Sequence, residues 1–296
     1  MKAALELGPL VSTGPLATVH RGVLGGRAVA VKRARPEVPG AGPALRREAR
    51  ILRAVSHPGL VPVLDVLDGP PAPALILGWA DGGSLADLLV DGPVGDDLVV
   101  QLVRPVAAAL EALHRSGVAH LDVAPQNVLL AAAGPFLIDP APPGAGTPGY
   151  TDPAVATGGP PSARSDVFGL AGCVHVALTG RSPRVDGGVA VGVRLPPAVQ
   201  AVLAAGLHPD PRQRPATPGA LVDRLERALP IAARAAPYPS PGPGRPVVRH
   251  CVPPAHPPRT WPFERWQEEA EAAAARRTAG PSAATSKVPP ELPLGV

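Results

Sequence analysis

Up to about residue 80, apolar and polar residues alternate in short runs that end at glycine or proline. Such alternation is typical of half-buried strands, whereas apolar residues at every third or fourth position are typical of a helix. Residues 11–23 and 27–33 follow the strand pattern, and the Gly25-Gly26 pair between them predicts a tight turn. Residues 43–54 follow the helical pattern. Two more short strands are predicted at 61–66 and 74–77.

From about residue 82 onward, the helical spacing dominates. A long helix is predicted over 96–115, starting from an aspartate cap, and Pro105 inside it predicts a kink because a mid-helix proline costs about 3 kcal/mol. Three more helices are predicted at 165–178, 197–207 and 218–229. The first of these is apolar on all sides, which predicts that it is buried. The chain therefore reads as an α+β protein with its strands first and its helices afterwards.

The character of the chain changes after Pro230. Residues 231–260 contain nine prolines, which favour an extended polyproline conformation over a compact fold. One isolated helix is predicted over about 261–278, and Gly280-Pro281 would end it. We therefore divide the chain into a folded domain, 1–229, and a proline-rich tail, 230–296.

Composition narrows the class of protein. The net charge of +4 comes from arginines scattered along the chain, so we expect no nucleic-acid surface. Two cysteines do not form a disulfide framework, and no apolar run reaches the roughly 18 residues of a membrane span. The N-terminus also lacks an apolar signal segment. We expect a cytoplasmic protein without a membrane span.

Two rare residues point to chemistry. The chain of 296 residues contains a single asparagine, Asn127, and only three lysines, of which Lys32 lies on a predicted strand. Asn127 follows Asp122 by five residues, and Lys32 ends the string V-A-V-K. Both arrangements occur in phosphoryl-transfer sites, where phosphates, metal and nucleophile must be held together. Chance survival explains either residue alone, but poorly explains both.

Ten short motifs occur in a consistent order. They are V-A-V-K (29–32), R-R-E-A-R-I-L (46–52), H-P-G-L-V (57–61), D-G-G-S-L (81–85), H-L-D-V-A-P-Q-N (120–127), L-I-D (137–139), G-T-P-G-Y (146–150), S-D-V-F-G-L (165–170), L-T-G-R-S-P (178–183) and D-P-R-Q-R-P (210–215). In this order the chain resembles the bacterial eukaryotic-like (Hanks-type) serine/threonine protein kinases from about residue 6 to 229. The resemblance implies a bilobal fold, with a β-rich N-lobe (1–78) containing one helix and a mainly α-helical C-lobe (79–229).

The resemblance also implies roles for single residues. Lys32, oriented by Glu48, would hold the phosphates of ATP, and Asp122 would accept or orient the proton of a substrate hydroxyl. Asn127 and Asp139 would bind Mg²⁺, which prefers oxygen ligands. The further ATP-binding residues would be Ser12, Gly14, Ala17, Val19, Ala30, Gly78, Ala80 and Leu129. The alternatives are a surface lysine, a surface glutamate on a helix, and an aspartate in a turn before Pro140.

Other motif residues would have structural roles. By the same resemblance, Asp166 would bind the backbone of the 120–127 loop from a buried helix, and His57 and His120 would be structural. Arg214 lacks the glutamate with which the family pairs it, because position 154 is alanine. Asp152, two residues earlier, is the candidate replacement, and a double-mutant cycle would test that pair.

The chain also departs from the family pattern. The turn at 12–17 reads S-T-G-P-L-A and keeps only the middle glycine, Gly14. Ala124 replaces a lysine that steadies the transferred phosphate, and Pro140 follows Asp139 where the family has phenylalanine. Leu121 replaces the arginine that pairs with a phosphorylated loop, so we predict no activating phosphorylation of Thr147 or Thr151.

Three functions remain open. The first is a slow protein serine/threonine kinase that uses ATP and Mg²⁺, independent of loop phosphorylation. The second is a nucleotide-binding pseudokinase scaffold, and the third is a small-molecule phosphotransferase. The protein substrate or partner is not identified by the motifs. Phe263, Trp266 and Ala270 in the tail would form a small apolar face that docks a partner, and the alternative is a disordered linker.

Overall fold

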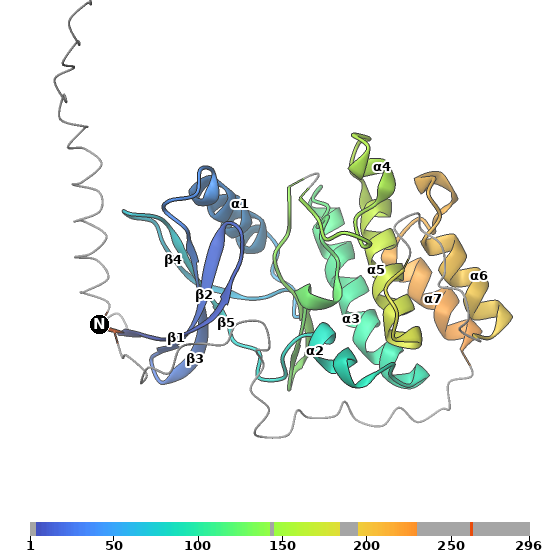
Figure 1. Cartoon of the computed structure of the whole chain (residues 1–296), viewed down its shortest axis with the longest axis horizontal. Helices are drawn as coiled ribbons and strands as arrows, with labels where there is room; N and C mark the ends of the chain where they lie inside the picture. Colours follow the sequence, from blue (N-terminus) through green and yellow to red (C-terminus); the bar gives the residue numbers. More distant parts are fainter. Residues whose placement is uncertain (1–3, 143–144, 184–194, 230–260, 263–296) are drawn as a thin grey trace, which may run out of the picture.

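The computed structural model describes residues 4–142, 145–183, 195–229 and 261–262. These residues form a sheet lobe from the first part of the chain and a helical lobe from the rest (Figure 1). The predicted α+β class and the bilobal arrangement are both confirmed.

The sheet lobe is built on an antiparallel sheet whose strands run in the order β4-β5-β3-β2-β1-β8. The strands are β1 (Leu5–Thr13), β2 (Ala17–Leu24), β3 (Arg27–Ala34), β4 (Val63–Leu67), β5 (Ala74–Gly78) and β8 (Trp261–Pro262). β3 lies in the middle of this sheet and carries Lys32, which pairs with Val19 of β2 and with Leu75 of β5. The site lysine is therefore held on both sides by strand hydrogen bonding.

Helix α1 (Ala41–Ala54) covers this sheet. It buries one face, formed by Ala41, Leu45, Glu48, Ala49, Ile51 and Leu52. This spacing is the three-and-four repeat of an amphipathic helix. Ala41, Leu45, Ala49 and Leu52 pack against β3 and β5, whereas Ile51 packs into the core of the helical lobe. Glu48 is the single charged residue on the buried face, and it needs a partner there.

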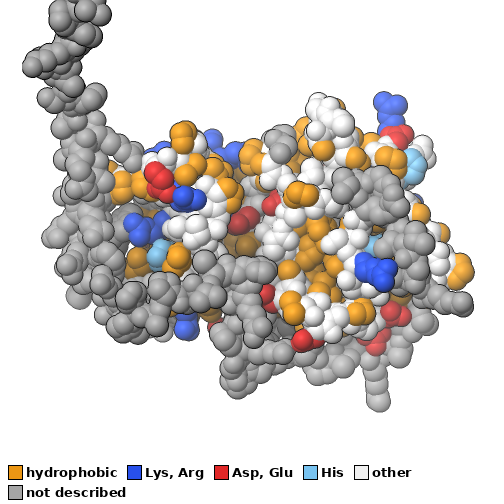
Figure 2. Space-filling model, viewed as in Figure 1, with side chains coloured by type: hydrophobic (Ala, Val, Ile, Leu, Met, Phe, Trp, Pro, Cys, Tyr) orange, Lys and Arg blue, Asp and Glu red, His pale blue; other side chains and the backbone are white. Residues whose placement is uncertain are grey.

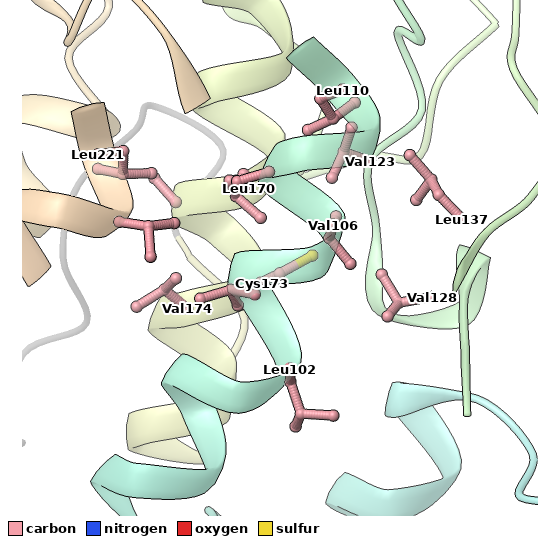
Figure 3. Packing of buried hydrophobic residues seen from close by; sticks show 14 of the residues in the cluster. Leu102, Val106, Leu110, Val123, Val128, Leu137, Leu170, Cys173, Val174 and Leu221 are labelled. Atoms are coloured by element: carbon pink, nitrogen blue, oxygen red, sulfur yellow. The ribbon is translucent and has the colours of Figure 1, made fainter. Parts of the chain in front are cut away.

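The helical lobe surrounds one large apolar core. Its main helices are α3 (Asp96–Arg115), α5 (Ala163–Thr179), α6 (Pro197–Gly206) and α7 (Pro218–Ala228), with the short helices α2 (Leu85–Leu88) and α4 (Pro153–Ala156). α5 is buried along almost its whole length, as its sequence predicts, and Leu170, Cys173 and Val174 lie in the core between α3 and α7 (Figure 3). The loop that carries Asp122 passes along this core through Val123.

A hairpin of β6 (Val128–Ala131) and β7 (Gly134–Leu137) joins the lobes. The amide of Leu137 donates to the carbonyl of Gly59 at 2.9 Å, and the amide of Val61 donates to Leu137 at 3.1 Å. Gly59 has to be glycine, because a Cβ there would lie 2.7 Å from the carbonyl oxygen of Pro105 in α3. This contact places Asp139, two residues after β7, beneath the sheet lobe.

The predicted pair of Arg214 and Asp152 forms. Nη2 of Arg214 lies 2.7 Å from Oδ1 of Asp152, and both side chains are buried. Burial alone would raise the pKa of Asp152, but the hydrogen bond and charge of Arg214, together with hydrogen bonds from Ser165 and the amide of Ala154, outweigh it and hold this pKa below its usual value. The guanidinium also donates to the backbone carbonyls of Arg164, His208 and Pro209.

Three sequence expectations need correction or qualification. The single strand expected over 11–23 is wrong: residues 14–16 form a turn between β1 and β2, because Gly14 and Pro15 interrupt the ladder. Helix α3 continues unbroken through Pro105. Of the tail helix expected at 261–278, the first two residues instead form β8, which pairs with Glu6 and Leu7 of β1.

The remainder of the expected tail helix, including Phe263, Trp266 and Ala270, lies outside the described residues. The division of the chain at 229 stays a prediction. Within the part that the structure describes, no helix combines the length and the apolar character that crossing a membrane requires.

Candidate active site

A buried lysine stands at the junction of the two lobes. Nζ of Lys32 lies 2.7 Å from Oε2 of Glu48 in α1 and 2.6 Å from Oδ1 of Asp139 after β7. Lys32 and Glu48 are almost fully buried, whereas the side chain of Asp139 is 39% exposed. Figure 2 shows acidic side chains at the surface where the lobes meet. Three residues predicted from separate motifs are thus brought together.

The charges of this cluster are unequal, since one ammonium group faces two carboxylates. Burial lowers the pKa of Lys32, but the charges of Asp139 and Glu48 outweigh it and raise this pKa above its usual value. Burial raises the pKa of Glu48 to about 7, with Lys32 opposing that rise and Asp139 adding to it. The second carboxylate oxygen of Glu48 has no hydrogen-bond partner among the described residues. A further cation or a proton would therefore be accommodated here.

Asp122 belongs to a second polar cluster. Its Oδ2 accepts from Nδ2 of Asn127 at 2.7 Å, and its Oδ1 accepts from the amide and the hydroxyl of Thr147 at 2.8 and 2.7 Å. The hydroxyl of Thr147 in turn receives a hydrogen bond from Nε2 of Gln126 at 2.6 Å. Both oxygens of Asp122 are thereby oriented, although the carboxylate remains half-buried and reachable.

The backbone around Asp122 is fixed from below by Asp166 of α5. Its two carboxylate oxygens accept the amides of His120 at 2.8 Å and Leu121 at 2.7 Å. One of them also contacts Nε2 of His114 at 2.7 Å. The structural role expected for Asp166 is therefore what its contacts show.

His120 joins the two clusters. Its Nε2 donates to the carbonyl of Ile138 at 2.9 Å, and its Nδ1 accepts the amide of Asp122 at 3.3 Å. This pattern needs a neutral ring, and burial lowers the pKa of His120, which keeps the ring neutral. Because Ile138 precedes Asp139, the imidazole ties the Asp122 loop to the Asp139 segment.

Two non-glycine residues of the site have left-handed backbone angles. Leu121 has a φ of 66° and Asp139 a φ of 63°. Such conformations cost about 1–3 kcal/mol each and persist where the surroundings impose them. Here the amide of Leu121 is held by Asp166, and Ala141 donates to His120 at 2.9 Å on the far side of Asp139. The site is thus built from strained, well-anchored backbone.

The residues expected at the base moiety of ATP come from both lobes. Ala30, Ala80 and Leu129 are half-buried and pack against one apolar cluster that spans both lobes. Ala30 pairs with Leu77 on β5, and Leu129 of β6 forms a bridge with Ser84. The amide of Gly78 is used internally by Pro62 at 2.9 Å. Sequence reading did not single out Trp79, whose ring lies 5.5 Å from the Arg21 guanidinium.

Both backbone polar groups of Gly14, in the turn that would cover the phosphates, already have hydrogen-bond partners. The amide of Gly14 donates to the carbonyl of Ala17 at 2.8 Å, and Arg35 donates to the carbonyl of Gly14 at 3.2 Å. Pro15 has no amide hydrogen. Ser12 and Ala17 carry side chains on either side of the turn. The turn therefore offers fewer free amides to a phosphate than a glycine-rich loop would.

The two residues expected to bind Mg²⁺ each keep one side-chain oxygen that their hydrogen bonds within the described residues do not use. Asn127 uses its amide nitrogen for the carbonyl and Oδ2 of Asp122, which leaves its side-chain oxygen for another ligand. Asp139 uses Oδ1 for Lys32, which leaves Oδ2. Among the described residues no group of three or more His, Cys, Asp or Glu could hold a metal. The donors present fit a cation that takes its remaining ligands from phosphates and water.

Sequence reading missed Thr147 and Gln126 as members of the site. Thr147 was considered only as a loop hydroxyl, and Gln126 as part of a motif. Thr147 contacts Asp122, and Gln126 contacts Thr147, because the fold brings residue 147 beside the 120–127 loop, for which spacing along the chain offers no signal. Ala124, the position expected to carry a lysine, is fully buried.

Comparisons with known proteins agree with this geometry. The family model described as "Protein kinase domain" matches residues 6–139. PknL of Mycobacterium tuberculosis, a serine/threonine-protein kinase, is 33% identical over 193 residues, which cover 58% of this chain and 48% of the relative. PknB of Mycobacterium leprae is 30% identical over 203 residues, covering 60% of this chain and 33% of the relative. Over residues 6–139 this chain is therefore similar to protein kinase domains, and its relatives among the curated proteins are bacterial serine/threonine kinases.

Solved structures of protein kinases share the fold of this chain. The M. tuberculosis PknI kinase domain superposes with a TM-score of 0.61 at 21% identity, covering 74% of this chain and 94% of that one. Rad53 in complex with AMP-PNP superposes with a TM-score of 0.64 at 23% identity, covering 73% and 63%. The kinase-like chain spans about a third to a half of the length of the curated relatives named above.

Proposed function

We propose that this chain transfers the γ-phosphoryl group of ATP to serine or threonine of a protein, slowly and without loop phosphorylation. The observation that carries the proposal is the linking of two polar clusters by His120 at the junction of the lobes. One holds Lys32, Glu48 and Asp139, and the other holds Asp122 and Asn127. Phosphoryl transfer depends mainly on positioning and on electrostatic stabilisation, and these are the groups that supply both.

In this proposal each residue of the chain has a defined task. Lys32, held by Glu48, orients the phosphates, while Asp122 orients the substrate hydroxyl and accepts its proton. Asn127 and Asp139 would hold Mg²⁺, which offsets phosphate charge when bound. Ser12, Gly14, Ala17 and Val19 would line the phosphate side of the cleft, and Ala30, Gly78, Ala80 and Leu129 the adenine side.

Slow transfer is expected because a cation is missing. Ala124 supplies no charge beside the transferred group, and Gln126, a neutral donor, reaches Thr147 instead. Removing one preorganised charge of this kind costs about 10²–10³ in rate. The turn at Gly14, whose amide is already used by Ala17, would also hold phosphate weakly.

Independence from loop phosphorylation is supported by the hydroxyls themselves. Thr147 donates to Asp122, and Thr151 donates to the carbonyl of Thr147 at 2.9 Å. Tyr150 is buried, with its hydroxyl 3.4 Å from Ser182. With leucine at position 121, a loop phosphate would also lack the arginine that the family uses.

A nucleotide-binding pseudokinase scaffold is the second candidate. Two features favour it: the amide of Gly14 is already used inside the 12–17 turn, and position 124 carries an uncharged alanine. Both would weaken the binding of phosphate. A small-molecule phosphotransferase is a weaker third candidate, because G-T-P-G-Y and D-P-R-Q-R-P are typical of protein kinases.

We further propose that the kinase domain occupies 1–229 and that the tail 230–296 is separate from it and docks a partner. We also propose that the protein is cytoplasmic and binds no nucleic acid.

One experiment separates these functions. Thermal unfolding is measured with ATP and Mg²⁺ and with ATP and EDTA, followed by transfer of labelled phosphate to generic protein acceptors. The Asp122→Asn variant tests the site, and Asp223→Asn, an exposed aspartate of α7, is the matched control. Mg²⁺-dependent stabilisation with transfer lost only in Asp122→Asn supports a kinase. Stabilisation without transfer supports the scaffold, and no response to nucleotide contradicts both.

A further inference from the structure

A cavity of about 680 Å³ lies on another side of α1 from the sheet. Its walls come from three elements far apart in sequence: α1, the end of α3 with the loop after it, and the start of α5. The lining residues are Arg47, Arg50, Ile51, Ala54, His114, Gly117, Val118, Ala119, Leu121, Pro161, Ser162 and Ala163. None of the residues assigned to nucleotide, metal or catalysis lines it.

The cavity is basic at its rim and apolar at its base. Of the described residues that line it, two are arginines and one is a histidine, and none is acidic. Ile51 is buried, and with Val118 and Leu121 it provides an apolar floor. Position 121 lines the cavity, and it carries leucine where the family pattern has arginine. The 120–127 loop therefore contributes no cation to the cavity, whereas α1 contributes Arg47 and Arg50.

Arg47 and Arg50 are available for binding. Neither forms a hydrogen bond or an ion pair with any residue in the described ranges, although Arg46, their neighbour on α1, pairs with Asp68 at 2.8 Å. Arg47 and Arg50 are three residues apart on a helix, so their side chains lie on the same face. His114 is held at 2.7 Å by Asp166 and does not compete with them.

Helix ends add to the positive potential. Ser162 and Ala163 form the N-terminal end of α5, a helix of 17 residues whose dipole is positive there. The opposing end of α3 contributes little, because the carbonyls of Leu113 and His114 already accept amides of Ser116, Gly117 and Val118. The cavity therefore favours anionic groups above an apolar floor.

The shape of the cavity favours a protein segment over a small ligand. Arg50, Ala54, Gly117, Pro161 and Ser162 are all exposed, so the cavity opens to solvent along one side. Small-molecule sites bury roughly 70–90% of their ligand, which this wall does not allow. Arginine is also among the residues enriched in protein interfaces.

We propose that this cavity docks an acidic segment of a partner protein. Carboxylates of that segment bind Arg47 and Arg50, and an apolar side chain between them covers Ile51 and Leu121. Charge complementarity specifies this occupant, since the cavity has unpartnered cations and no acid. Resting on the proposed function, the partner would also steady α1, which carries Glu48 to Lys32.

The test selects phage-displayed random short peptides on the full chain without nucleotide, so that its outcome does not depend on catalysis. Peptides rich in Asp and Glu around an apolar residue are expected. Their affinity is expected to fall at least about tenfold in Arg47→Gln/Arg50→Gln and further in Arg47→Glu/Arg50→Glu. Arg53→Glu, an exposed α1 arginine outside the cavity, is the matched control and should change affinity less than about twofold.

Thermal melting of each variant separates lost binding from lost folding, and the neutral Gln pair guards against disruption by charge reversal. Selected peptides without acidic enrichment would overturn the proposal. Acidic peptides that bind the double variants and the parent equally would overturn it too. Peptides that match the acidic stretch of this chain at 264–271 would assign the cavity to the chain itself rather than to a partner.

Discussion

Two buried cations in this protein, Lys32 and Arg214, have opposite surroundings. The guanidinium of Arg214 donates to one carboxylate and three backbone carbonyls and stacks 4.9 Å from the ring of Phe168. Within the described part of the chain, the ammonium of Lys32 pairs with two side chains, Glu48 and Asp139, which come from different lobes. Both cations are paired, but only Arg214 is enclosed by main-chain acceptors.

The difference separates a structural ion pair from a functional one. Backbone carbonyls do not titrate or rotate away, so Arg214 has one stable arrangement. Carboxylates can change protonation or take a metal, and Asp139 is reachable from solvent. Lys32 can therefore exchange partners, which the phosphate-binding role proposed for it would require.

The largest expected effect is loss of folding stability at Arg214. Asp152→Ala leaves a buried guanidinium without its counter-charge, so the free energy of unfolding should fall by about 3–5 kcal/mol, and Arg214→Ala should cost a similar amount. Denaturant unfolding of both variants and of the double variant measures the coupling. Arg104→Ala, in an exposed pair with Asp223, is the control and should cost less than about 1 kcal/mol. Additive single effects would show that the pair is not coupled.

Lys32→Met should affect stability less than the Arg214 variants do, but should strongly reduce phosphate transfer. We expect its unfolding free energy to fall by about 1–2 kcal/mol, less than for Arg214, because water reaches Asp139 and Glu48 can take a proton. Phosphate transfer should fall by about 10²–10³. Unfolding and transfer are measured on one preparation. A stability loss as large as that of Arg214→Ala would remove the distinction between the two cations.

The pH dependence of stability should reveal the excess acid near Lys32. Because the pKa of Glu48 is raised to about 7 in the folded protein, the folded state binds more protons than the unfolded state from pH about 4.5 to 7. Its contribution is present at low pH and is lost as pH rises. The parent should lose about 2–3 kcal/mol relative to Glu48→Gln between these values, since each pKa unit corresponds to about 1.4 kcal/mol. Parallel curves for the two proteins would contradict the raised pKa.

Restoring the glycine turn should have a smaller effect, on nucleotide alone. Ser12→Gly with Ala17→Gly removes two side chains beside Gly14 and lets backbone approach phosphate, so ATP should bind a few-fold more tightly. Calorimetry with ATP and Mg²⁺ measures this change. Arg27→Gly, at the other end of the β2–β3 hairpin, controls for the flexibility that glycine adds. Equal affinities in all variants would mean that the turn does not touch phosphate.

The last prediction is that loss of a loop hydroxyl has no effect on phosphate transfer. Thr151→Val should leave transfer within about twofold, because its hydroxyl contacts only the carbonyl of Thr147 and no cation stands at position 121 to receive a phosphate. Phosphatase treatment of the parent protein should likewise leave its rate of phosphate transfer unchanged. Thr157→Val, at the end of α4, serves as the control. Activity that rises with phosphate on Thr147 or Thr151 would contradict phosphorylation independence.

Much of the fold was predictable because local patterns agree with it. The boundaries of α3 and of β5 follow directly from periodicity and punctuation, and the motifs indicated a bilobal kinase domain. The break between β1 and β2 was missed, since Gly14 and Pro15 were judged as a phosphate turn within one strand. β8 was missed because pairing of residue 261 with residue 7 is non-local, and a proline-rich sequence offers no sign of it.

By itself the sequence predicted the kind of site that is proposed here and most of its members. Residue type and order along the chain sufficed to single out Lys32, Asp122 and Asn127, because phosphoryl-transfer chemistry restricts which side chains can serve. Only the tertiary structure decided which charges are shared, that Gln126 reaches Thr147, and that Arg47 and Arg50 face an open cavity. These depend on distances between segments far apart in the chain, and burial, not spacing, decides whether a charge there is paired.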